Sequence, residues 1–189
     1  MALNNRPAGK QRYRLRAHLK AGGVVAYPTE SSYGLGCLPR HALGLRRIVQ
    51  LKKRNQHKGL VLIGHDWASL RGLLHRLPEN QEATLLTHWP AAKTFLLPAA
   101  KRVLPLLRGK GRSTLAVRIP DLETARFLCR AVGSALVSTS CNCAGKRACR
   151  QSREVCRQFG KRVWIIDGRI GKQKQPSQII DWASGKRLR

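Results

Sequence analysis

Short apolar segments alternate with longer segments of helical periodicity along the whole chain. The short segments are rich in valine, leucine and isoleucine and are typical of buried strands, whereas the longer ones are typical of helices. This alternation indicates the α/β class, in which helices flank a twisted mixed sheet. Neither an internal repeat nor a linker divides the sequence, so we expect residues 1–189 to form a single domain.

The expected elements follow from this periodicity. Helices are expected at 10–21, 41–53, 66–77, 80–88, 121–132 and 152–159, and strands at 24–27, 59–63, 94–97, 114–119, 135–140, 163–166 and 178–182. Asp66, Asn80 and Asp121 are expected to cap three of the helices, because a carboxylate or amide oxygen accepts the free N–H groups of a first turn. The glycine-punctuated segment 27–36 is expected to turn after the first strand.

The charge of the chain is strongly positive. Lysine and arginine number 37 against 9 acidic residues, which gives a formal net charge of +28. Such a field attracts polyanions, of which nucleic acid is the usual one, so tRNA or double-stranded RNA is an expected partner. A proteome that is basic throughout would produce the same composition without any RNA-binding role.

The cysteines and the apolar runs exclude two other classes of protein. The six cysteines lack the paired C-x-x-C spacing of structural zinc sites, so no metal site is expected. The longest apolar runs are about five residues, far short of the ~20 that span a bilayer, so no membrane association is expected. Without a secretory signal, free thiols and a cytoplasmic location are the expectation.

Three separate segments, 27–36, 52–59 and 138–142, carry the residues suited to binding chemistry. The first combines hydroxyl groups with glycines that let a ligand approach the backbone closely. The third places hydroxyl groups and an amide at the end of an expected strand, where open α/β sheets bind ligands. Each segment alone is also compatible with an ordinary loop. Together they indicate a protein that holds a polyphosphate beside a small polar substrate.

Four cationic residues are candidates for binding an anion, either within the protein or on a ligand. Lys52, Arg54 and Lys58 lie at the end of an expected helix and in the loop that follows it, where they complement the helix dipole or clamp phosphates. Arg118 falls in a strand that is expected to be buried, and a buried arginine needs an anionic partner. Either a substrate carboxylate or an internal acid can supply it, and with only 9 acids in the chain the substrate is favoured.

Seven ordered blocks carry a resemblance to a known family. They include Tyr-Pro-Thr-Glu-x-x-Tyr-Gly-x-Gly-Cys and Ser-Thr-Ser-x-Asn, and they fall at 27–37, 51–60, 89–94, 114–120, 138–142, 176–179 and 185–189. On these blocks the chain resembles the YrdC/TsaC family, the threonylcarbamoyl-AMP synthases, in its short single-domain form. The resemblance implies a YrdC-like fold, with the twisted sheet and its helices arranged around a deep basic cavity.

The resemblance also implies a reaction and a set of site residues. L-Threonine, bicarbonate and ATP, with Mg²⁺, would give threonylcarbamoyl-adenylate and pyrophosphate, and a downstream complex would transfer the threonylcarbamoyl group to tRNA. Catalytic roles would fall to Lys52 and Arg54, ATP binding to Arg54, Lys58, Thr114, Ser140, Asn142 and Arg189, and threonine binding to Ser31, Arg118, Ser138 and Ser177.

The chain departs from the family pattern at Asn55, at Ala91-Ala92 and at Ala144. These changes affect loop shape and remove one hydroxyl group, but they leave the named site residues in place. A second hypothesis is a non-catalytic protein that binds double-stranded RNA or tRNA on the same fold, which the net charge favours.

Overall fold

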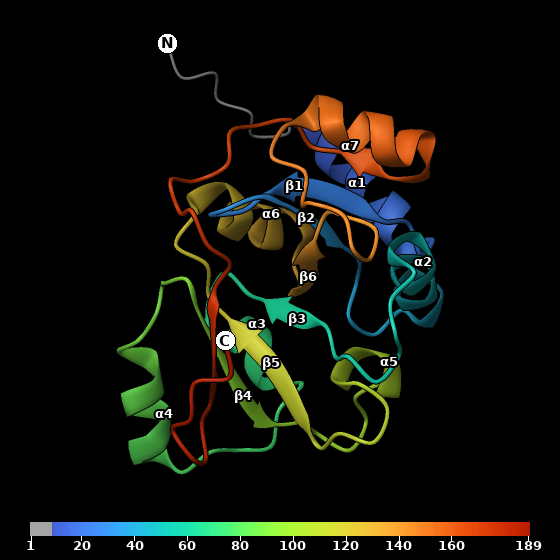
Figure 1. Ribbon diagram of the computed structural model, residues 1–189. Coiled ribbons are helices and arrows are strands. Elements are labelled where there is room, and N and C mark those ends of the chain that lie inside the picture. The colour runs from blue at the N-terminus through green and yellow to red at the C-terminus, as the bar shows by residue number, and fades with distance from the viewer. Residues whose placement is uncertain (1–8) are drawn as a thin grey trace.

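The computed structural model describes residues 9–189 (Figure 1). One eight-stranded sheet runs through the molecule in the order β7-β1-β2-β6-β3-β5-β4-β8. The strands are β1 (Val25–Pro28), β2 (Tyr33–Gly36), β3 (Val61–Ile63), β4 (Lys93–Pro98), β5 (Thr114–Arg118), β6 (Leu136–Ser140), β7 (Trp164–Ile165) and β8 (Gln178–Asp181). The helices are α1 (Gly9–Lys20), α2 (Ala42–Lys52), α3 (Ala68–Arg71), α4 (Glu79–Leu86), α5 (Pro105–Arg108), α6 (Glu123–Val132), α7 (Ser152–Phe159) and the 3-10 helix η1 (Gly160–Arg162).

The sheet is mixed, as expected. Strand β2 pairs antiparallel with β1 and with β6, and β6 pairs antiparallel with β3. Strand β3 then runs parallel to β5, and β4 joins β5 antiparallel and β8 parallel. Because β6 lies between β2 and β3, the sheet brings the first turn of the chain next to residues more than a hundred positions later.

Alternate residues of β1 point to opposite faces of the sheet and so enter two hydrophobic clusters. Val25 and Tyr27 pack with Leu15 of α1 and Leu128 of α6. Ala26 belongs to the larger cluster, which includes buried apolar side chains of α2 and α7. Helices therefore cover both faces of the sheet, and the predicted α/β class is confirmed (Figure 1).

Two predicted elements are wrong. Four of the ten residues of the segment 27–36 form strand β2, and only residues 29–32 turn the chain between β1 and β2. The helix predicted at 66–77 is reduced to the four residues of α3. Beyond Gly72 the chain leaves helical geometry because its backbone pairs with the end of β4: Leu74 forms a bridge with Ala99, and the N–H of His75 donates to the carbonyl of Pro98 at 2.9 Å.

The glycines of β2 serve close packing rather than a turn. A Cβ atom on Gly36 would lie 2.6 Å from the carbonyl oxygen of Val137 and 2.8 Å from a ring carbon of Tyr27. Both distances are shorter than real Cβ contacts allow, so only glycine lets β2 lie this close to its neighbours.

Of the three predicted helix caps, Asp66 is confirmed, because its carboxylate accepts the N–H of Ser69 in the first turn of α3 at 2.9 Å. The other two are wrong: Asn80 lies inside α4, and the N–H of Asp121 donates to the carboxylate of Glu30 at 3.1 Å. Pro78 and Leu122 are the N-cap residues of α4 and α6 instead. In residues 9–189 no helix combines the length and the apolar character needed to cross a membrane.

Candidate active site

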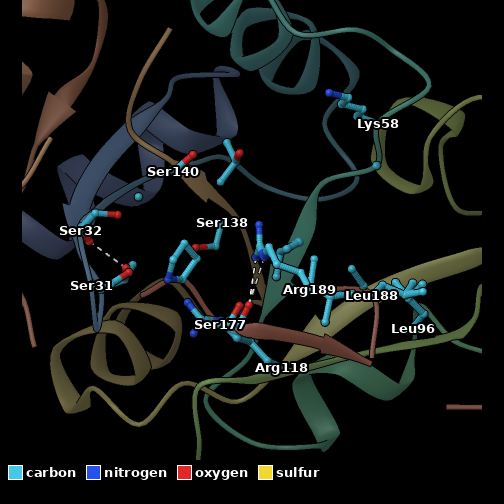
Figure 2. A pocket seen from close by; sticks show the side chains of 18 of the residues that line it. Ser31, Ser32, Lys58, Leu96, Arg118, Ser138, Ser140, Ser177, Leu188 and Arg189 are labelled. Atoms are coloured by element: carbon cyan, nitrogen blue, oxygen red, sulfur yellow. Dashed lines mark hydrogen bonds between the residues drawn. The ribbon is translucent and has the colours of Figure 1, made fainter. Parts of the chain in front are cut away.

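A cavity of about 450 Å³ opens where distant stretches of the chain meet. Its walls come from residues 29–34, from 54–61, from β5 and the loop before it, from the end of β6 and from 176–189. In Figure 2, Ser31, Ser138, Ser177 and Arg118 face a common space, and Lys58 lies across it. The lining includes Ser31, Arg54, Lys58, Thr114, Arg118, Ser138, Ser140, Ser177 and Arg189 from the predicted set.

One part of the cavity is crowded with cations. Helix α2 ends at Lys53 in the left-handed conformation (φ 49°), and the chain then turns so that Arg54 lines the cavity. Arg54 is fixed by donating from Nε to the carbonyl of Lys58 at 3.2 Å and from Nη2 to that of Gly59 at 2.7 Å. Burial, and then the charges of Arg189 and Arg112, lower the pKa of Arg54. Such uncompensated crowding favours a polyanionic ligand.

Lys52 and Asn142 are not among the lining residues. The buried ammonium of Lys52 donates to the carbonyl and to the side-chain oxygen of Asn142, both at 2.9 Å, and to the carbonyl of Ser140. Burial first, and repulsion from Arg54 second, lower the pKa of Lys52 to about 8. Lys52 therefore holds the chain that follows β6 instead of facing the cavity.

Arg118 has an internal partner. Its Nη1 donates to Oε1 of Glu30 at 2.8 Å, and both side chains are buried. Of the two partners that the sequence left open, the acid is therefore present in the protein itself. The pair is nonetheless incomplete, because Nε of Arg118 and Oε2 of Glu30 are buried without a hydrogen-bond partner. Both residues line the cavity, and the two unpartnered atoms themselves lie beneath its surface. A buried polar atom without a partner is unusual, so a ligand that reaches the pair can supply the missing one.

Hydrogen bonds and strand pairing with neighbouring elements fix the positions of the serine residues in the cavity. Ser177 shares a hydrogen bond of 2.9 Å with Thr94 of β4, and its carbonyl accepts Nε and Nη2 of Arg189 at 3.3 and 3.1 Å. Ser138 lies on β6 opposite Val61 of β3. The last residues of the chain are thus tied to the same wall as the central strands.

The family pattern of Sua5, YciO and YrdC, described as "Telomere recombination", matches residues 17–189. The chain belongs to this family. It is 60% identical over 182 residues to the threonylcarbamoyl-AMP synthase of Neisseria gonorrhoeae, a match that covers 96% of each protein. The resemblance drawn from the sequence blocks is confirmed.

Solved structures of the Sua5/YciO/YrdC family share the fold. The crystal structure of P. abyssi Sua5 complexed with L-threonine matches with a TM-score of 0.82 and 29% identity, over 91% of this chain. This chain spans about half of that protein, 51% of its length. E. coli YciO matches with a TM-score of 0.78 and 25% identity, over 93% of this chain and 85% of its own.

Sequence reasoning assigned no role to three charged residues of the cavity, Glu30, Arg108 and Arg112. Glu30 stands inside the Tyr27-Pro-Thr-Glu block, which was itself a signal, but its pairing with Arg118 depends on strands far apart in the sequence. The two arginines carry no local pattern in a chain this basic. Only the fold distinguishes them from surface cations.

Proposed function

We propose that this protein is a threonylcarbamoyl-AMP synthase, which converts L-threonine, bicarbonate and ATP to threonylcarbamoyl-adenylate and pyrophosphate. The names of its relatives support this reaction, as does the threonine complex of the P. abyssi structure. The observation that carries the proposal is one cavity in which a cluster of cations adjoins the Glu30–Arg118 pair and several hydroxyl groups. A triphosphate and an amino acid have the chemistry that these two regions require.

The proposed roles follow from this division of the cavity. Arg54 and Lys58 bind ATP phosphates, with Thr114, Ser140 and Arg189 completing the nucleotide site. Ser31, Arg118, Ser138 and Ser177 hold threonine. Asn142 belongs to the nucleotide site through its side-chain oxygen, which accepts the hydroxyl of Ser140 at 2.7 Å. Lys52 supports catalysis by fixing that loop, since its donors are already used on Ser140 and Asn142.

The cations also account for the chemical step. The threonine carbamate that forms from bicarbonate is an anion, and it attacks the α-phosphate of ATP, which is also anionic. Fixed positive groups around the phosphates lower the cost of bringing these charges together and stabilise the departing pyrophosphate. Arg54 is suited to this role because two hydrogen bonds fix its guanidinium before ligand binds.

Mg²⁺ would enter with the nucleotide. Glu30 is the one carboxylate among the described residues that line the cavity, and it is already paired with Arg118. Phosphate oxygens and water are the ligands that Mg²⁺ usually takes in such sites. The ion would partly neutralise the triphosphate, and the protein residues would orient it.

The product is proposed to pass in the cytoplasm to a complex that modifies tRNA, and the same chain is proposed to bind tRNA or double-stranded RNA through its charge. We also propose that residues 1–189 act as a single domain. The non-catalytic alternative is less favoured, because the relative at 60% identity bears the name of the synthase.

Pyrophosphate release tests the enzyme directly. We expect release from ATP that requires both L-threonine and bicarbonate, and omission of either should abolish it. A protein that binds RNA but releases no pyrophosphate would support the alternative instead.

A further inference from the structure

The unpartnered oxygen of Glu30 is the least explained atom of the cavity. Oε1 of this carboxylate accepts two hydrogen bonds, from Nη1 of Arg118 at 2.8 Å and from the N–H of Asp121 at 3.1 Å. Oε2 is buried and accepts none. A buried carboxylate oxygen without a donor is costly, so a ligand that brings a donor gains free energy from it.

The position of Glu30 is fixed by its backbone. The carbonyl of Glu30 accepts the N–H of Gln173 at 3.1 Å, and the hydroxyl of Thr29 closes the turn by donating to the carbonyl of Ser32 at 2.7 Å. Gly171 packs so closely that a Cβ there would lie 2.8 Å from the carbonyl oxygen of Glu30. The carboxylate is therefore held in place before a ligand arrives.

The charges around Oε2 restrict what the donor can be. Phosphate groups are repelled by a carboxylate and attracted to the cations of the same cavity, so the triphosphate is not the partner of Glu30. An ammonium group is both a hydrogen-bond donor and a positive charge. Free α-amino acids carry an ammonium beside a carboxylate, which matches the unpartnered atoms of two side chains that are themselves in contact, Glu30 and Arg118.

We infer that Glu30 accepts the α-ammonium group of the amino-acid substrate and, together with Arg118, selects free α-amino acids over acids that lack the amine. This inference rests on the proposed function, because it concerns the amino-acid half of the same cavity. Nε of Arg118 binds the substrate carboxylate while Oε2 of Glu30 binds the ammonium. Glu30 is thereby a specificity-determining residue that sequence reasoning did not assign.

The test compares two ligands on two proteins by calorimetry without ATP. L-Threonine carries the ammonium group, and 3-hydroxybutanoate keeps the carboxylate and the hydroxyl without it. The wild-type protein should bind threonine at least about tenfold more tightly, the value expected of one charged hydrogen bond. Glu30→Gln should lower the affinity for threonine by about tenfold or more. The affinity for 3-hydroxybutanoate should be unchanged or higher, because Arg118 is released from its internal partner.

The opposite responses separate recognition from structure. If the role of Glu30 were purely structural, the substitution would lower the affinity for both ligands together, and that result would overturn the inference. Glu79→Gln, an exposed acid of α4 outside the cavity, is the matched control and should change neither affinity. If Glu30→Gln fails to fold, Glu30→Asp, which keeps the charge but withdraws it by one methylene, should show the same selective loss of threonine.

Two outcomes distinguish this inference from the proposed function. If the wild type releases pyrophosphate with threonine but Glu30→Gln and Glu30→Asp keep full threonine selectivity, the function stands and the role of Glu30 is wrong. If the wild type neither binds threonine nor releases pyrophosphate, both are wrong.

Discussion

The ammonium of Lys52 lies 2.9 Å from the side-chain oxygen of Asn142, 90 residues further along the chain. The same oxygen accepts the hydroxyl of Ser140 at 2.7 Å, and the amide nitrogen of Asn142 donates to the carbonyl of Lys146 at 2.6 Å. These bonds join the end of α2 to the loop after β6. Ser140 is thus oriented toward the cavity by a residue that does not itself line it.

The lowered pKa of Lys52 predicts an alkaline limit on activity. Its folded pKa is about 8, so below that pH the ammonium is charged and holds Ser140 and Asn142, and above it one donor and the charge are lost. Single-turnover adenylate formation should therefore decline as pH rises through about 8. Lys52→Arg keeps its charge in this range and should show no such decline.

That decline should not come from unfolding caused by Lys52. Its folded pKa lies below the unfolded value, so the neutral form favours the folded state, and its contribution to stability increases between the two values as pH rises. Thermal unfolding measured just above pH 8 should show a folded protein. A loss of structure parallel to the loss of rate would contradict the assignment to Lys52.

Arg54→Ala should abolish adenylate formation while the protein stays folded. The substitution removes a charge-assisted phosphate contact and two bonds to the carbonyls of Lys58 and Gly59. Pyrophosphate release is the measurement, and Arg46→Ala, on the exposed side of α2, is the control that should keep full activity. Turnover at the wild-type rate in Arg54→Ala would place the phosphates elsewhere.

Arg118→Leu should both destabilise the protein and raise its threonine requirement far more than its ATP requirement. It leaves Glu30 buried without a counter-charge, which costs about 3–5 kcal/mol of unfolding free energy. The double variant Glu30→Leu/Arg118→Leu should recover much of that loss without recovering threonine binding. Urea unfolding and substrate titrations measure the two effects, and equal weakening of both substrates in a folded variant would argue against a threonine role.

Gly36→Ala should lower stability by about 1–3 kcal/mol, because the new methyl group overlaps the carbonyl of Val137 and the ring of Tyr27. Gly72→Ala is the matched control, since its methyl group would meet only an Arg40 nitrogen at 3.7 Å. Chemical unfolding of the two variants gives the comparison. Equal stability of both would mean that β2 can move away from its neighbours at little cost.

The net charge of +28 predicts RNA binding that weakens steeply with salt. Each neutralised phosphate contributes about −0.7 to −0.9 to the log–log slope. Arg153→Ala/Arg157→Ala, on the exposed side of α7, should reduce the slope and leave adenylate formation unchanged. Titration of labelled tRNA against a duplex competitor checks this, and undetectable binding at low salt would remove RNA from the proposal.

Sequence reasoning located the strands that form the cavity because their apolar runs are short and bounded by polar turns. It predicted both ends of α7 correctly, and the ends of β5 and β6 to within one residue. It failed at β2, since glycines at 34 and 36 indicate a turn locally, whereas the structure shows that Gly36 is required by the close approach of Tyr27 and Val137. That cause is tertiary and has no local signature.

The part of the candidate site that could be predicted consists of residues whose side-chain chemistry alone indicates ligand binding, namely hydroxyl groups and cations. Ser31, Arg54, Lys58, Ser138 and Ser140 of the three segments line one cavity because β6 lies between β2 and β3, whereas Lys52 and Asn142 do not line it. The orientation of Lys52 toward Asn142, and the pairing of Arg118 with Glu30, were not predictable, since each joins residues about ninety positions apart.

The cavity owes its shape to stretches that lie at both ends and in the middle of the chain. The lining residues run from Thr29 to Arg189, so no short fragment contains all of the walls, and the pocket can appear only late, once the long-range strand pairings have closed. A ligand that contacts opposite walls binds only the fully folded protein. It therefore stabilises the fold against every partial opening that separates those walls, and ligand binding can be used to measure whether the whole fold is intact.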